Sequence, residues 1–282
     1  MRASSNGTSG PHAPLCGNIL AVAMNRCIFC DVALDPSQYN LPTSRTEEHV
    51  FGKWFREAVT SRNMTMFTAM KGQVPKLHRN PPLERLVNRS VCKACNNGGK
   101  SQLERDVAAV FKRLEIEDVG TLPESHIELL ARWAGKTASV ISHVTPQLAR
   151  VPVYASRSLH PRSPVQPRMG FFYSQIISDV IIEGGYLQLL YEPSLPLVGT
   201  EELNGTRITL CINNHCLTVD FPVVIEGASY DLSKSCSAML WPRRIPAGRA
   251  KIQIFGPESI RDALLAVNHQ IEVSIDLERL MS

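Results

Sequence analysis

The chain has 282 residues, 44% of them hydrophobic and 20% charged, with a formal net charge of +4 at pH 7. This composition is typical of a soluble globular protein and leaves room for one large domain or two of ordinary size. No apolar run reaches the roughly 18 residues needed to cross a bilayer, which argues against a membrane-spanning protein.

Residues 1–23 are rich in Ser, Gly, Asn and Ala and carry no convincing export signal, so we expect a disordered tail. The next segment holds two Cys-x-x-Cys pairs, Cys27/Cys30 and Cys92/Cys95. Each pair presents two thiolates to one ion, and two pairs complete the tetrahedral set of a structural Zn²⁺ site. The chain has eight cysteines and the others are scattered, which indicates metal ligands in a reducing, cytoplasmic compartment rather than a disulfide framework.

The segment between the two cysteine pairs contains polar side chains suited to hydrolytic chemistry, Glu48 and His49. Apolar residues at helical spacing then predict a short helix over residues 50–59. Residues 61–82 have little periodicity and are expected to be mainly loop, or an irregular hairpin. A strand is predicted over residues 83–92, leading into the second cysteine pair.

The clearest helix is predicted over residues 101–119, where one stripe is apolar and charges occupy the other face. A second helix is predicted over residues 123–143, inside a helical extension that spans residues 119–145. Residues 146–170 are rich in Pro and Arg and are expected to form an extended connector, with an ordered surface strap as the alternative.

From residue 171 to 282 the pattern favours strands with one helix, so we expect a C-terminal β-rich α+β domain of unassigned role. The predicted strands cover residues 171–182, 186–191, 207–213, 216–225, 251–255 and 271–275, and the predicted helix covers 258–267. This domain would select a substrate, a partner or a regulatory ligand. The fold class predicted for the whole chain is α+β, with a zinc-bearing domain at residues 24–118.

The N-terminal motifs resemble the zinc-bearing members of the HNH, or ββα-metal, endonuclease family of bacterial or phage type. The resemblance covers roughly residues 26–118. The matching stretches are Cys27-Ile-Phe-Cys30, Glu48-His49-Val50, Val91-Cys92-Lys-Ala-Cys95-Asn96-Asn97-Gly98, Lys100 and Leu103-Glu104. In this family the cysteine pairs hold structural zinc, the acid-His pair lies on a β-hairpin, and an Asn or His after the last cysteine begins the metal-binding helix.

The resemblance implies an N-terminal ββα-metal (HNH) fold and an enzyme that hydrolyses DNA phosphodiester bonds with one catalytic divalent ion. His49 would be the general base, because a neutral imidazole can take a proton from water near neutral pH. Glu48 and Asn96 would hold Mg²⁺ or Mn²⁺, with Asn97 as a substitute for Asn96. Asn88 is the nearest match to the family's middle Asn, although it lies slightly late in the chain.

The region around the cysteine pairs is strongly basic, since residues 45–100 contain eleven Lys or Arg and four Asp or Glu. DNA is the natural partner of such a region, and the predicted phosphate contacts are Lys53, Arg56, Lys93 and Lys100. Two other functions stay open: a zinc-stabilised nucleic-acid-binding protein without catalysis, and an adaptor whose zinc domain supports the C-terminal domain. A homodimer would supply two active sites for cutting both strands.

Overall fold

The computed structural model describes residues 26–34, 41–58, 64–70, 76–77, 82–144, 156, 159, 170–178, 185–196, 202–212, 215–221, 228–231, 238–241, 251–254 and 272–275. Within them the chain is a mixed α+β structure, which confirms the predicted fold class at that level. The predicted tail, most of the predicted connector and the helix predicted over residues 258–267 lie outside the described residues. None of the described helices is both long and apolar enough to cross a membrane.

The N-terminal part of the described chain runs strand, strand, helix. Strands β1 and β4 pair antiparallel, and the chain then passes without a loop into a helical run. These elements are β1 (Arg45–His49), α2 (Lys53–Ala58), η1 (Leu83–Arg85), β4 (Val87–Cys92), α3 (Lys93–Cys95), the π-helical turn η2 (Asn96–Lys100) and α4 (Ser101–Leu114). The short helix α2 falls within its predicted range, and α4 begins at its predicted residue but ends earlier.

A β-bulge interrupts β1 just before the predicted catalytic pair. The register with β4 shifts between Thr46 and Glu48, and Glu48 then faces Asn88 across the hairpin. A bulge re-aims the side chains beside it. As a result Glu48 is buried, whereas Glu47 and His49 on either side of it are exposed.

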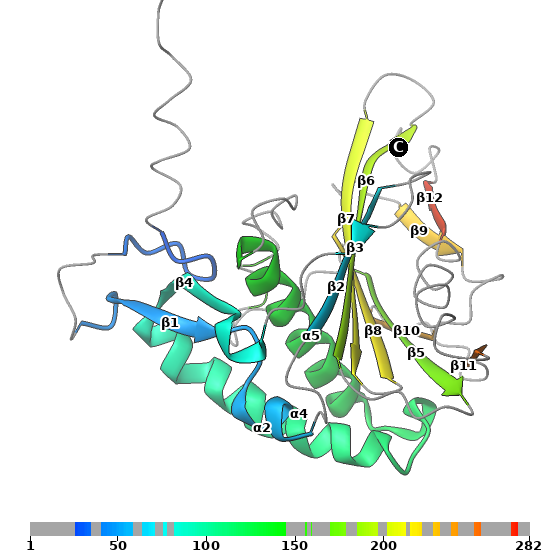
Figure 1. Cartoon of the computed structure of the whole chain (residues 1–282), viewed down its shortest axis with the longest axis horizontal. Helices are drawn as coiled ribbons and strands as arrows, with labels where there is room; N and C mark the ends of the chain where they lie inside the picture. The colour runs from blue at the N-terminus through cyan, green and yellow to red at the C-terminus, as the bar shows by residue number, and fades with distance from the viewer. Residues whose placement is uncertain are drawn as a thin grey trace, which may run out of the picture.

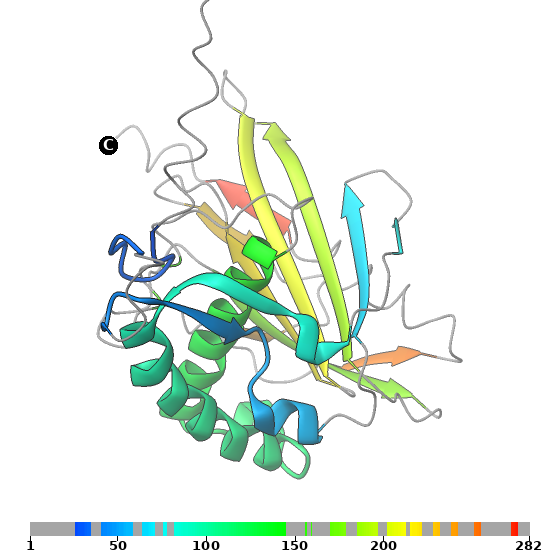
Figure 2. The same cartoon turned by 60° about the vertical axis from the view of Figure 1, so that its left-hand side comes forward.

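Helix α5 (Glu124–Val144) forms the centre of the described fold, and its bounds agree with the helix predicted from sequence. Figures 1 and 2 show it between the β1–β4 hairpin and the large sheet, and it contacts β4 on one side and β5, β8 and β10 on the other. A helix covered on opposite sides must be apolar around most of its circumference. Gly135 permits this close packing, because a Cβ there would lie 2.6 Å from Leu159 Cδ2 and 3.0 Å from Phe171 Cε1.

The large sheet has eight strands among the described residues, in the order β10-β5-β8-β7-β6-β2-β3, with β11 parallel to β5 beside β10. Its strands are β2 (Met64–Met70), β3 (Lys76–Leu77), β5 (Gly170–Ser178), β6 (Gly185–Pro196), β7 (Glu202–Ile212), β8 (His215–Phe221), β10 (Ala238–Trp241) and β11 (Lys251–Ile254). A separate pair joins β9 (Ala228–Asp231) to β12 (Glu272–Ile275).

Strand β2 lies in the stretch 61–82, which was expected to be mainly loop or an irregular hairpin. It forms a hairpin with β3, as that alternative predicts, and it also pairs in parallel with β6, which was not predicted. Its partner is more than one hundred residues away in sequence, so no local pattern announces the pairing. The sheet therefore combines strands from the predicted segments 24–118 and 171–282, and the boundary between those segments stays a prediction.

Candidate functional site

The four cysteines of the two Cys-x-x-Cys pairs form one cluster. Their sulfur atoms all lie within 4.8 Å of one another, and Cys30 Sγ is 3.6 Å from Cys92 Sγ. Tetrahedral Zn²⁺ with Zn–S bonds of about 2.3 Å separates its sulfurs by about 3.8 Å. The sulfur spacing therefore fits a tetrathiolate zinc site. In the described part of the chain, no other group of three or more His, Cys, Asp or Glu side chains lies close enough together to hold a metal ion.

Backbone amide groups orient the sulfur atoms of the cluster. Cys92 N donates to Cys27 Sγ at 3.4 Å, and Cys95 N donates to Cys92 Sγ at the same distance. The first cysteine loop is closed by a bridge between Arg26 and Ala33. Amide donors stabilise negative sulfur, so the loops are built to hold thiolates.

The protonation of the cluster favours a bound cation. A hydrogen bond from the Cys95 thiol lowers the pKa of Cys27 to about 4. Burial raises the pKa of Cys30 to about 11, and the hydrogen bond to Cys27 raises the pKa of Cys95 further. One thiolate therefore forms readily, while the Cys30 and Cys95 thiols resist ionisation in a cluster without positive charge. A dication removes that resistance, because thiolates are its ligands.

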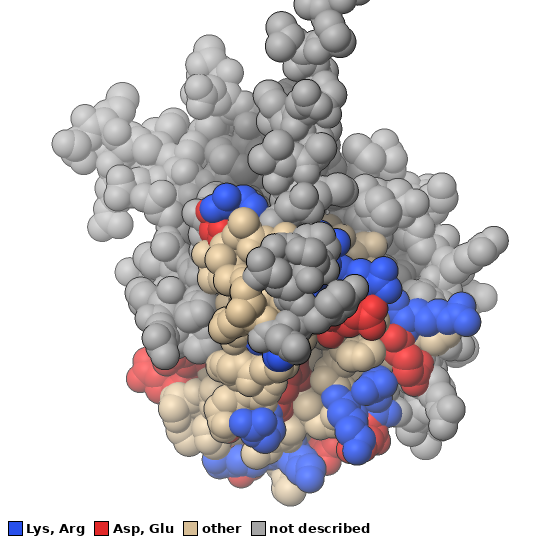
Figure 3. Space-filling view, turned by 90° about the vertical axis from the view of Figure 1, so that its left-hand side faces the viewer, with Lys and Arg blue, Asp and Glu red and all other residues tan. Residues whose placement is uncertain are grey.

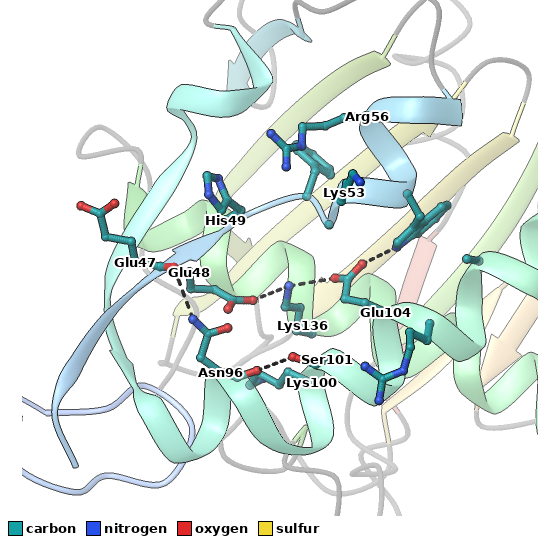
Figure 4. A pocket seen from close by; sticks show the side chains of 15 residues that line it. Glu47, Glu48, His49, Lys53, Arg56, Asn96, Lys100, Ser101, Glu104 and Lys136 are labelled. Carbon is teal, nitrogen blue, oxygen red and sulfur yellow. Dashed lines mark hydrogen bonds and ion pairs between the residues drawn. The ribbon is translucent and has the colours of Figure 1, made fainter. Parts of the chain in front are cut away.

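A cavity of about 560 Å³ lies next to this cluster, where β1 ends and the helical run begins. Glu48, His49 and Asn96 all line it, so the structure brings together the three residues that the sequence predicts as the catalytic set. The cavity is connected to the four-cysteine cluster through the chain itself, because Asn96 directly follows Cys95. Figure 4 shows the arrangement of the lining side chains.

The Asn96 side chain is fixed by two donor contacts. Its Nδ2 donates to Thr46 Oγ1 at 3.1 Å and to the backbone oxygen of Glu47 at 3.3 Å. The carbonyl end of the amide points toward the Glu48 carboxylate in Figure 4. Asn97 is exposed and does not line the cavity, so only the first of the two predicted asparagines is placed to act there.

His49 is exposed and lines the cavity from the end of β1. In Figure 4 its ring lies on the opposite side of the β1 ribbon from the Glu48 carboxylate. The imidazole therefore has access to solvent and to an incoming substrate, but it is not in contact with Glu48.

The predicted phosphate contacts are distributed unevenly. Lys53 and Arg56 on α2 line the cavity, while Lys93 does not. Lys100 lines the cavity but is only 2% exposed, and its Nζ lies over the Phe29 ring without a hydrogen-bond partner. Burial, reinforced by the nearby Lys136 charge, lowers the pKa of Lys100 to about 7. Its position differs from that of an exposed phosphate contact.

The Glu48 carboxylate is part of a buried charge network that sequence reasoning missed. Glu48 is 5% exposed, and its Oε1 lies 2.6 Å from Lys136 Nζ, which also lies 2.9 Å from Glu104 Oε1. Although burial disfavours the charged lysine, the carboxylates of Glu104 and Glu48 raise the pKa of Lys136. A lone lysine among the apolar and small residues of α5 was the only sequence signal of this network.

Two indole groups complete the network around Glu104. Trp133 Nε1 donates to Glu104 Oε1 at 3.1 Å, and Trp54 Nε1 donates to Oε2 at 2.5 Å. Gly52 leaves room for this contact, because a Cβ there would lie 2.5 Å from Glu104 Oε2. The two tryptophans pack against each other, and their N–H groups also hold a carboxylate.

Comparison of the chain with protein-family models, with curated proteins and with solved structures finds no match.

Proposed function

We propose that the protein is a metal-dependent endonuclease that hydrolyses DNA phosphodiester bonds. The observation that carries this proposal is the convergence of Glu48, His49 and Asn96 on one cavity beside a four-cysteine cluster. The strand, strand, helix order around that cavity and the order of the motifs along the chain support an HNH-type site.

The oxygen donors at the cavity fit a small divalent cation. One oxygen of Glu48 contacts Lys136, and no partner of its other oxygen is found within the described residues. The same holds for the side-chain oxygen of Asn96, whose nitrogen makes both of the amide's contacts. Carboxylate and amide oxygens suit Mg²⁺ or Mn²⁺. When bound there, such an ion acts as a Lewis acid that stabilises negative charge on phosphate oxygens.

In this proposal His49 accepts the proton of the attacking water. An exposed imidazole is neutral over much of the physiological pH range and can act as a general base. His49 and Glu48 both line the cavity of about 560 Å³, which has room for water and a phosphodiester. Lys53 and Arg56, from the helix beside the cavity, contribute positive charge toward the phosphate backbone.

The cysteine cluster has a structural role in the proposal. A zinc ion there would join the first cysteine loop to the start of the helical run, and the ligand Asn96 would follow the fourth cysteine directly. Loss of zinc would then disturb the cavity without removing any group that acts on the substrate.

Plasmid cleavage with Mg²⁺ or Mn²⁺ tests the proposal. We expect His49→Ala to slow cleavage by about a hundredfold or more, the usual range for loss of a general base. His126→Ala is the matched control, because His126 lies on α5, contacts Arg113 and does not line the cavity. Zinc content and far-UV circular dichroism must match among the proteins. Equal cleavage by wild type and His49→Ala would remove His49 from the mechanism.

A second candidate function is a zinc-stabilised nucleic-acid-binding protein without catalysis. The ion pair between Glu48 and Lys136 favours it, because the carboxylate already has a cationic partner. Figure 3 shows the side of the molecule with β1 and β4, where basic and acidic side chains are interspersed, so the charge of this face by itself does not favour binding to nucleic acid. This function predicts DNA or RNA binding with no cleavage under any divalent cation. The adaptor function predicts neither binding nor cleavage.

A further inference from the structure

The ammonium group of Lys136 lies between two carboxylates at the wall of the cavity. Its Nζ contacts Glu48 Oε1 and Glu104 Oε1, both within hydrogen-bonding distance, and its side chain is 1% exposed. In hydrolytic sites with two metal ions, a small divalent ion can occupy such a position between two carboxylate oxygens. Here the bridging cation belongs to the protein chain (Figure 4).

We propose that Lys136 is a positioning residue, a built-in cation that takes the place of a second divalent ion between Glu48 and Glu104. It thereby restricts the cavity to one exchangeable ion on the Asn96 side of Glu48. The inference rests on the proposed function, because it concerns the divalent ion that Glu48 and Asn96 would hold.

The network fixes each of its members in turn. Glu104 accepts from Trp54, Trp133 and Lys136, so its carboxylate cannot turn toward the cavity without losing several hydrogen bonds. Lys136 is consequently held in place, and it holds one oxygen of Glu48. Only the second oxygen of Glu48 is left to meet an ion beside Asn96.

The charges of the network also limit what the cavity can bind. The network itself, with two carboxylates and one ammonium, carries a single net negative charge, although Lys53, Arg56, Lys100 and Arg105 also line the cavity. The ammonium of Lys136 repels a divalent ion from its side of Glu48. An ammonium attached to α5 cannot dissociate, so the position between the carboxylates stays filled when the exchangeable ion leaves. Replacing Lys136 alone by an apolar side chain would leave two largely buried carboxylates without their cationic partner, and a divalent ion could then compensate them.

Mn²⁺ binding to the zinc-loaded full-length chain, followed by electron paramagnetic resonance of the free ion, tests the inference without an activity assay. Wild type is expected to bind a single Mn²⁺. Lys136→Met, which keeps the side-chain length and removes the charge, is expected to bind Mn²⁺ at least about tenfold more tightly. Lys112→Met is the matched control, because Lys112 is exposed on α4 and does not line the cavity. It should reproduce the wild-type curve.

Glu104→Gln serves as the second variant in case Lys136→Met does not fold. With one carboxylate removed, Lys136 is compensated by Glu48 alone, and Mn²⁺ affinity is expected to fall by at least about fivefold. Unchanged affinity in folded Lys136→Met, or in folded Glu104→Gln, would overturn the inference and leave the proposed function standing. Mn²⁺ binding by Lys136→Met but not by wild type would mean that Lys136 fills the position of the exchangeable ion itself, which would contradict the inferred single exchangeable ion as well as the proposed catalytic ion. Binding by neither protein would contradict both.

Discussion

Glu48 and Asn88 face each other across the β1–β4 hairpin, and both side chains are buried. Glu48 reaches helix α5 through Lys136, and Asn88 reaches it through the backbone oxygen of Val140 at 3.3 Å. These two points on α5 are one helical turn apart. The hairpin that carries the candidate site is therefore connected to the helix at the centre of the fold. The geometry of the cavity depends on α5 as well as on the four-cysteine cluster.

The Asn88 contact predicts a measurable loss of stability. Asn88→Ala leaves the backbone oxygen of Val140 and the amide of Ser90 without their side-chain partners. Leaving buried polar groups unsatisfied should lower the free energy of unfolding by about 1–3 kcal/mol. Asn97→Ala, an exposed asparagine in the same chain region, should change it by less than about 0.5 kcal/mol. Urea unfolding of the two variants gives the comparison, and coincident curves would show that the Asn88 contacts contribute nothing.

Metal analysis tests the cysteine cluster. The purified protein should contain about one zinc ion per chain, as a single tetrathiolate site requires. Cys92→Ser should lose the zinc and unfold at a lower temperature, because binding energy at such a site is also folding energy. Cys216→Ser is the control for zinc content, since Cys216 is a buried cysteine in β8 outside the cluster. A zinc-free protein with unchanged stability would contradict the structural role of the cluster.

Buried His215 predicts a pH dependence of stability that is independent of the metal sites. Its Nδ1 lies 2.7 Å from the Tyr173 hydroxyl, and burial lowers the pKa of His215 from 6.5 to about 4. Between these values the unfolded chain binds a proton that the folded chain does not. The contribution of neutral His215 to the free energy of unfolding is therefore complete above pH 6.5. As the pH falls toward 4, up to about 3 kcal/mol of this contribution is lost.

The comparison protein for this measurement is His215→Asn, which keeps a polar atom near Tyr173 and removes the titrating group. The free energy of unfolding of wild type should fall more steeply than that of the variant between pH 6.5 and pH 4. Parallel curves would mean that His215 takes up its proton equally in the folded and unfolded states.

The salt dependence of DNA binding tests the cavity's cationic rim. Lys53 lines the cavity with a side chain that is 84% exposed, and it forms a 3.5 Å ion pair with Glu57. If Lys53 contacts phosphate, Lys53→Ala should reduce the slope of log affinity against log salt by about one. Lys112→Ala removes an exposed charge on α4 that does not line the cavity, so this variant should leave the slope unchanged. Equal slopes for all three proteins would place Lys53 outside the interface.

The parts of the site that sequence could predict are those encoded in short, ordered spacings. The two Cys-x-x-Cys pairs fix four sulfur ligands, and Glu48 with Asn96 follows from motif order around them. Helix α4 could also be predicted from sequence, because its buried residues recur at helical intervals. In each case the residues that act together are close in sequence or lie in a recognisable motif, so local pattern carries the information.

The parts that sequence could not predict depend on contacts between distant elements. The parallel pairing of β2 with β6 was missed because β6 comes from another part of the chain. The Lys136–Glu48–Glu104 network joins α5, β1 and α4, and nothing in any one segment specifies it. Lys100 was expected at the surface because lysines usually are, yet the Phe29 ring covers it.

The rate of Mn²⁺-dependent cleavage of a labelled DNA duplex by Asn96→Ala and Asn97→Ala tests the central claim most directly. These neighbours have identical side chains, but only Asn96 lines the cavity with Glu48 and His49. If those three residues form a phosphodiester-cleaving centre, Asn96→Ala should cleave about a hundredfold more slowly than wild type, while Asn97→Ala keeps the wild-type rate. Equal rates for the two variants, with zinc content and fold intact, would contradict the account.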